Sequence, residues 1–96
     1  MDVRIVTPDG EVFFSNSVTE LTAPGYEGEF GVLEGHTPFL TTFEAGKVSL
    51  KDAAGEHAFA VWSGFIEVGP SSVSIAVENA EPAGAIDIER ARKDAA

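Results

Sequence analysis

Cysteine is absent from this chain of 96 residues. Without thiols it can form neither a disulfide nor a thiolate metal site. No apolar run approaches the roughly 20 residues needed to cross a bilayer. No basic segment followed by an apolar stretch marks a secretory signal. The length suits one domain with a single modest core, and a cytoplasmic address is compatible with the lack of cysteine.

Basic residues are also scarce, because 6 Lys and Arg stand against 16 Asp and Glu, for a formal net charge of −10. Three of these bases, Arg90, Arg92 and Lys93, lie close to the C-terminal end, so the rest of the chain is more acidic still. Such a surface repels phosphate backbones and anionic lipid headgroups, which disfavours nucleic-acid binding and direct lipid insertion. We expect most acids to be solvated and some to face a basic protein partner.

Groups for nucleophilic or metal chemistry are few. The two histidines, His36 and His57, are far apart in sequence, and the chain has no Gly-x-Ser-x-Gly elbow and no short-spaced ligand set. We expect His57 to be an exposed polar residue that alternates outward from Phe59. His36 is expected in a Gly-rich turn, as a structural loop residue or as a contact residue. The sequence therefore predicts neither a catalytic nor a metal site, and a small hydrolase would require a deep pocket around His36.

Short strand-like runs separated by turn clusters fill the chain up to Val77. One predicted hairpin joins 48–51 to 57–62, and another joins 64–68 to 73–77. These patterns predict a mainly β fold, a flattened antiparallel β-sandwich or barrel of about 8–10 short strands. The large residues expected to fill its core are Phe13, Phe30, Phe59 and Phe65.

Helical periodicity appears only at the end of the chain, where Asp87 can cap a short helix over 88–96. A helix this short is marginal by itself, so it must pack on something or fray. The sequence EPAG at 81–84 is the clearest break. We therefore predict a β-sandwich domain over 1–80, followed over 81–96 by a linker and the start of a C-terminal helix.

The segment 27–42, EGEFGVLEGHTPFLTT, carries three glycines and Pro38 between strand-like stretches. Glycine admits backbone angles closed to other residues, and proline fixes one dihedral angle. The chain is therefore expected to bend sharply, run briefly as a strand at 30–32, bend again at 35–36 and re-enter a sheet at Phe39. This pattern indicates a shaped surface, in which Tyr26, Glu27 and Glu29 are either contact residues or a solvated loop tip.

Residues 27–41 match the pattern E-G-E-[LF]-G-[IV]-[LYM]-x-G-H-[AT]-P-x-L-T. Through this pattern the chain resembles the epsilon subunit of bacterial F-type ATP synthase. Further matches follow the family's order along the whole chain: VRIVTP at 3–8, FS at 14–15, AGKV at 45–48, SGFIEV at 63–68 and IDIERA at 86–91. Departures from the family pattern are Asn16 for Gly, Ala45 for Pro, and one residue fewer in the glycine pair after Ser63.

The resemblance implies a non-catalytic central-stalk subunit, which couples ion-driven rotation of the c-ring to the gamma subunit and hence to ATP synthesis. Its implied partners are gamma and the polar loops of the c-ring, and no cofactor is needed. Its implied location is peripheral, at the cytoplasmic face of the bacterial inner membrane. The alternative is a free-standing acidic β-sandwich that binds another basic protein, and failure to bind gamma at micromolar concentration would favour it.

Particular contact residues are implied as well. The c-ring side would contain Glu27, Gly28, Glu29, His36 and Thr37, and the gamma side Thr41. The resemblance places Glu29 closest to an arginine of the c-ring, so Glu29→Lys should weaken assembly with the membrane sector and leave folding intact. Trp62 is expected to fill the core, with an anchor at the gamma interface as the alternative.

The IDIERA stretch resembles the [IL]-D-x-x-R-A motif through which some bacterial epsilon subunits bind ATP, and it implies Asp87 and Arg90 as nucleotide-binding residues. We prefer a helix cap with a solvated arginine, because exposed ion pairs contribute only about 0–1 kcal/mol. Most of the family's C-terminal helical hairpin is expected to be missing. The chain would then couple rotation without braking ATP hydrolysis, and weak ATP binding would require those helices.

Overall fold

The computed structural model describes residues 1–33, 35 and 37–83, and most of these residues lie in strands. The strands are β1 (Asp2–Thr7), β2 (Gly10–Ser15), β3 (Glu20–Gly25), β4 (Gly28–Leu33), β5 (Phe39–Asp52), β6 (Gly55–Val68) and β7 (Ser72–Pro82). They form one seven-stranded sheet in the order β2-β1-β7-β6-β5-β3-β4. All neighbours are antiparallel except β1 and β7, which are parallel. The predicted mainly β fold and both predicted hairpins are confirmed.

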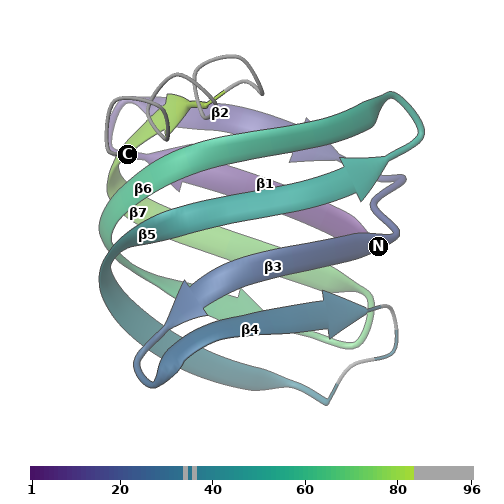
Figure 1. The fold of residues 1–96 in the computed structure, drawn as a ribbon, viewed down its shortest axis with the longest axis horizontal. Coiled ribbons are helices and arrows are strands. Elements are labelled where there is room, and N and C mark those ends of the chain that lie inside the picture. The colour runs from purple at the N-terminus through teal and green to yellow at the C-terminus, as the bar shows by residue number, and fades with distance from the viewer. Residues whose placement is uncertain (34, 36, 84–96) are drawn as a thin grey trace, which may run out of the picture.

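The sheet curls over on itself, so that β3 and β4 lie in front of β1 and β7 (Figure 1). Strands β5, β6 and β7 are long because they run through the bend and contribute to both layers. We expected about 8–10 short strands. The described part of the chain has seven strands, because each of the long strands β5, β6 and β7 runs through both layers, where we expected two short strands.

The bend in β6 is centred on Ser63, whose φ of 52° is the only positive value of a non-glycine residue in the described part of the chain. The register of β6 with β5 and with β7 skips the row that contains Glu44, Ser63 and Glu78. Val61 and Ile66 are both fully buried although they are an odd number of positions apart. The inward face of β6 therefore changes parity at Ser63, where a regular strand would keep strict alternation.

Three hairpin turns share one construction. Two residues separate β1 from β2, β3 from β4 and β5 from β6, and each second strand begins with a glycine. These glycines, Gly10, Gly28 and Gly55, have φ values of 127°, 123° and 127°. An L side chain is strained at positive φ, whereas glycine adopts it freely. The short sequences PDG, YEG and AAG thus set where three of the chain reversals occur.

The core lies between the two layers and is aliphatic for the most part. Its fully buried larger side chains are Ile5, Leu21, Ile66, Ile75, Val3, Val18, Val32, Val48, Val61 and Val68. Phe59 is buried, and Phe13 and Phe30 pack against the core at its edge, as expected. The prediction for Phe65 is wrong, because its side chain is 45% exposed. The parity change at Ser63 turns Ile66 inward and Phe65 outward, and Phe43 is buried instead.

Strand β7 continues through Glu81 and Pro82, which were expected to open the linker. Pro82 pairs with Phe59, and the Ala83 N–H donates to the Ala58 carbonyl at 2.7 Å. The β domain therefore extends past residue 80. The predicted helix over 88–96 lies outside the described residues. Among the described residues, no helix is long and apolar enough to cross a membrane.

Candidate functional site

An open groove of about 450 Å³ lies between the β3–β4 turn and the start of β5. Its lining residues are Gly25, Tyr26, Glu27, Gly28, Glu29, Phe30, Phe39, Leu40 and Thr41. All of them belong to the stretch that the sequence singled out as a shaped surface, or lie directly beside it. The groove thus joins two segments that the β4–β5 connection separates along the chain.

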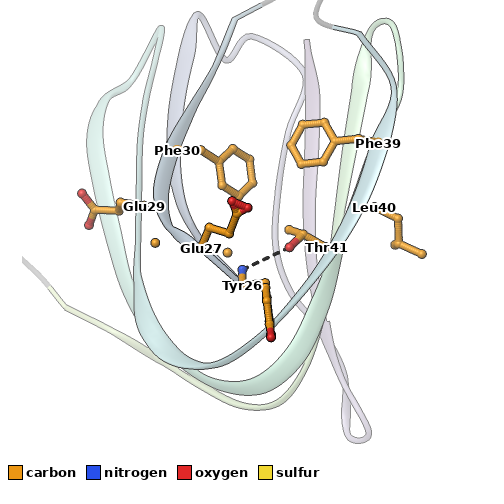
Figure 2. A pocket seen from close by; sticks show the side chains of 9 residues that line it. Tyr26, Glu27, Glu29, Phe30, Phe39, Leu40 and Thr41 are labelled. Atoms are coloured by element: carbon orange, nitrogen blue, oxygen red, sulfur yellow. Dashed lines mark hydrogen bonds between the residues drawn. The ribbon is translucent and has the colours of Figure 1, made fainter.

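Strand alternation sorts these side chains into two sets. Successive residues of a strand point to opposite faces, so Glu29 faces away from Phe30, and Leu40 faces away from Phe39 and Thr41. Figure 2 shows this arrangement, with Glu29 and Leu40 directed outward on either side of the groove. Glu27 belongs to the turn, and its carboxylate is directed to the side of the aromatic rings. Both acids of the turn therefore border the groove, with Glu29 at its outer edge.

The wall of the groove is aromatic. The rings of Phe30 and Phe39 meet edge to face, with centroids 5.0 Å apart and planes at 65°. This geometry is the favourable one for two aromatic rings. Gly25 lies directly against the Phe30 ring, since a Cβ atom at this position would be 3.0 Å from the ring. A glycine at the end of β3 therefore allows Phe30 to lie across the hairpin.

A hydrogen bond of Thr41 connects the two sides of the groove. The Thr41 Oγ1 accepts a hydrogen bond from the Tyr26 backbone N–H at 3.1 Å and donates to the Thr42 carbonyl at 3.4 Å. Tyr26 itself is 84% exposed at the mouth of the groove. The turn is thereby held against β5 by a hydrogen bond that the sequence pattern did not indicate.

The structure brings together Glu27, Gly28, Glu29 and Thr41 at this groove, although the resemblance assigned Thr41 to the gamma side and the others to the c-ring side. Thr37 is exposed in the segment before β5. His36 lies outside the described residues, as do Asp87 and Arg90 of the nucleotide motif. Phe30 and Phe39 were not predicted as site residues, and their only sequence signal is that they flank the glycine-rich turn and Pro38.

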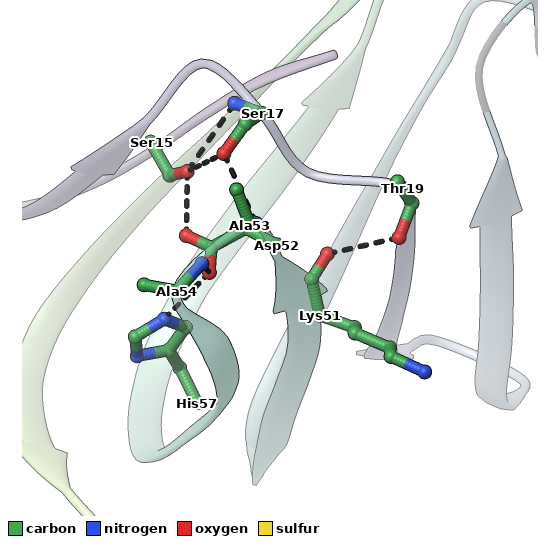
Figure 3. Close-up of polar contacts among 8 residues, drawn as sticks. All are labelled: Ser15, Ser17, Thr19, Lys51, Asp52, Ala53, Ala54 and His57. Atoms are coloured by element: carbon green, nitrogen blue, oxygen red, sulfur yellow. Dashed lines mark hydrogen bonds and ion pairs between the residues drawn. The ribbon is translucent and has the colours of Figure 1, made fainter.

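A second polar cluster lies at the opposite end of the β5–β6 hairpin (Figure 3). The Ser15 hydroxyl donates to Asp52 Oδ2 at 2.7 Å, and His57 Nε2 lies 3.0 Å from Asp52 Oδ1. The hydroxyl donates to the carboxylate and not to the imidazole, so this is not a nucleophile–base pair. The cluster ties the end of β2 to the β5–β6 turn, and its role is structural.

Hydrogen bonds set the charge state of this cluster. The hydroxyl of Ser15, followed by His57 and the Ala54 N–H, lowers the pKa of the Asp52 carboxyl below its ordinary value of 3.8.

The expectation that His57 is exposed and points away from Phe59 is wrong. Residues two apart in a strand share a face, and the half-buried His57 ring packs against Phe13 with centroids 5.2 Å apart.

Trp62 lies on the outside of the bend, 38% exposed, between Ala45 and Asn79. The preferred interpretation of Trp62 as core filler is therefore wrong, because Val61 occupies the inward position. Among the described residues, no group of three or more His, Cys, Asp or Glu could hold a metal ion.

Residues 1–83 match the model of the family described as "ATP synthase, Delta/Epsilon chain, beta-sandwich domain". The chain belongs to this family. Proteins called ATP synthase epsilon chain are 44% identical over 93 residues in Anaeromyxobacter sp. (strain K) and 46% identical over 91 residues in Desulforapulum autotrophicum. These matches cover 97% and 94% of this chain, and 70% and 67% of the respective relatives.

Solved structures agree with the family. A chain of the Euglena gracilis mitochondrial ATP synthase, in an assembly described as OSCP/F1/c-ring, is 26% identical with a TM-score of 0.78. The match covers 96% of this chain but only 59% of the Euglena chain. A chain of the Tetrahymena thermophila mitochondrial ATP synthase, at 18% identity and a TM-score of 0.70 over 84% of this chain and 65% of that one, has the same fold. The sequence resemblance to the epsilon subunit is thus confirmed.

Proposed function

We propose that this chain is a non-catalytic subunit of the rotor of a bacterial F-type ATP synthase. It would bind the gamma subunit and rest on the polar loops of the c-ring, so that rotation of the ring reaches the central stalk without slip. Its place would be peripheral, at the cytoplasmic face of the inner membrane. The observation that carries the proposal is the family match over residues 1–83, which covers the whole described β domain.

The fold suits a mechanical role. Two of its strands, β5 and β6, are 14 residues long and pair with each other over almost their full length. Because both strands run through the bend, a load on one layer is carried into the other by continuous backbone and its hydrogen bonds. The small β domain would therefore transmit force as one body.

The acid-rich surface suits a basic partner. The described residues include 12 Asp and Glu against Arg4, Lys47 and Lys51. Complementary charge across an interface contributes specificity and encounter rate more than affinity. In this proposal the β3–β4 turn and Thr37 face the c-ring, and apolar burial against gamma supplies most of the binding free energy. Thr41 would lie where these two contacts meet.

Size-exclusion chromatography with purified gamma tests the proposal. We expect co-elution at micromolar concentration, and a further shift when detergent-solubilised c-ring is added. If gamma and the chain elute separately under these conditions, the free-standing protein-binding module becomes the better account. The same chromatography at high and low salt shows how much of the binding to gamma is electrostatic, because salt screens contacts between exposed charges.

A further inference from the structure

Strand β4 is an edge of the sheet. Among the described residues it has β3 on one side and no strand on the other (Figure 1). Backbone N–H and C=O groups along a free edge can pair with a strand from another chain. The pairs of an antiparallel ladder alternate between those that exchange two hydrogen bonds and those that exchange none. The groups that are free on β4 can therefore be assigned from a single residue pair.

Pro24 identifies the pairs of the β3–β4 ladder that exchange no hydrogen bonds. It lies opposite Glu29 and has no N–H to donate, so it fits a pair of this kind. The register stays constant along β4, so the pairs of Gly31 and Leu33 are of the same kind. The backbone N–H and C=O groups of these three β4 residues therefore point away from β3, and all three residues are exposed.

Other free edges of the sheet are protected. The pairing of β2 has a register shift between Ile5 and Val6, and such an irregularity twists an edge away from a regular partner. Beyond its pairing with β1, β7 ends at Pro82, which removes a donor. The start of β5 lies against the β3–β4 turn, where the Thr41 hydroxyl accepts from the Tyr26 N–H. Strand β4 has a regular register, no proline and no lysine, so it lacks these protections.

Charge indicates which kind of strand fits this edge. Glu29 is the one charged side chain of β4, and the whole chain has a formal net charge of −10. A second copy of the chain would bring the same net charge, which opposes the pairing of two identical edges. A lysine or arginine across from Glu29 is favourable, and an apolar side chain can cover Leu33, which is 61% exposed. Gly31 lies between them and has no side chain that could obstruct a neighbouring strand.

We infer that β4 accepts an extended, basic segment of a partner protein as an additional strand of the sheet. The backbone groups of Glu29, Gly31 and Leu33 supply the pairing, and the carboxylate of Glu29 selects a cationic segment over an acidic one. This inference goes beyond the proposed function and does not depend on it, because it uses only the backbone and the charge of an exposed edge.

Solvent exchange of single amides tests the pairing. The blocked hexapeptide Thr-Lys-Val-Lys-Val-Thr is titrated into the ¹⁵N-labelled chain, and exchange is measured by NMR. At about ten times its dissociation constant, the peptide should slow exchange of the Glu29, Gly31 and Leu33 amides about tenfold. The amides of Phe30 and Val32 face β3 and should be unchanged. Binding without this alternation, or protection of a different edge, would overturn the inference.

Two variants of Gly31 form a matched pair. Gly31→Pro removes the central N–H of the free edge and places its ring toward the incoming strand, but this N–H takes no part in the pairing with β3. Gly31→Ala keeps the N–H, and its Cβ atom would be 3.9 Å from the nearest atom. We expect Gly31→Pro to weaken peptide binding at least about fivefold and Gly31→Ala by less than about twofold. Equal affinities of the two folded variants, checked by circular dichroism, would exclude backbone pairing.

Changes to the peptide test the same inference in the wild-type chain, whether or not Gly31→Pro folds. The hexapeptide with N-methyl groups on its central amides cannot pair as a strand and should not bind. Replacement of both its lysines by glutamates should weaken binding about fivefold, because like charges then face each other. Undiminished binding of either peptide would overturn the inference.

Analytical ultracentrifugation tests the choice of partner. The wild-type chain should stay monomeric at the concentrations of the titration, because its net charge opposes self-association. A dimer that Gly31→Ala preserves and Gly31→Pro dissociates would assign the edge to a second copy of the chain and overturn the assignment to a basic segment.

Discussion

At the scale of single residues, the strongest local constraint is the backbone of Ser63. Its φ of 52° belongs to a region in which an L side chain costs about 1–2 kcal/mol. Ser63 lies inside β6, at the bend of the sheet, where glycine would be unstrained.

We therefore expect Ser63→Gly to stabilise the chain by about 0.5–1 kcal/mol, because relief of strain exceeds the extra backbone entropy that glycine loses on folding. Urea unfolding followed by circular dichroism measures the change. Ser49→Gly, in a regular part of β5, is the control and should destabilise by about 0.5–1 kcal/mol. If Ser63→Gly lowers the stability of the chain, the Ser63 hydroxyl contributes more to the free energy of unfolding than the backbone strain costs.

The polar cluster around Asp52 gives a second residue-scale prediction. Because the folded state lowers the pKa of Asp52, its contribution to stability is fully present above the unfolded pKa of about 3.9 and is lost as pH falls through the lower folded value. Asp52→Asn should lower the urea midpoint at pH 7. The difference in urea midpoint between the wild type and the variant should become smaller below about pH 4. A gap that stays constant down to pH 3 would argue against this assignment.

At the scale of elements, hairpins depend on the glycine that follows each two-residue turn. The local sequence was enough to place these turns, because the conformational freedom of glycine does not depend on the rest of the fold. The face that each strand buries was harder to predict. Alternation gives the correct answer for Val73, Ile75 and Val77, which are all buried. Alternation fails across β6, because the inward face of the strand changes parity at the bend, between Val61 and Ile66.

Gly28→Ala tests the role of the turn that carries the groove. A Cβ atom there meets no atom within 4 Å, so any cost comes from the backbone at φ 123°. We expect a loss of about 1–2 kcal/mol in the free energy of unfolding. Gly31→Ala is the matched control on the same strand, with its nearest contact at 3.9 Å and no positive φ. It should be neutral, or stabilise by up to about 1 kcal/mol.

At the scale of the whole molecule, the bend places Trp62 and Phe65 on the outside, although both were expected inside. Exposed aromatic residues of this size are frequent energetic centres of protein interfaces. Their position on the outer surface supports the alternative interpretation of Trp62 as an anchor for gamma. The curled sheet thus leaves Trp62 and Phe65 on the outer surface of its bend, while Phe43 lies inside.

Trp62→Ala should therefore weaken binding to gamma at least about tenfold, with little effect on folding. Surface plasmon resonance with immobilised gamma measures the affinity, and thermal unfolding of the free chain checks the fold. Val12→Ala on β2, 45% exposed in the wild type, is the control and should bind gamma as the wild type does. Unchanged affinity for Trp62→Ala would place the gamma contact elsewhere.

The sequence by itself determined the mainly β class, the positions of the turns, the family and the stretch that carries the groove. These properties follow from local backbone preferences, from periodicity and from motifs that are contiguous along the chain. Only the tertiary structure decided that Thr41 bonds to the Tyr26 backbone, that His57 lies beside Asp52, and that Trp62 and Phe65 lie outside. These depend on register and on the bend through the row of Glu44, Ser63 and Glu78, where the inward face of β6 changes parity.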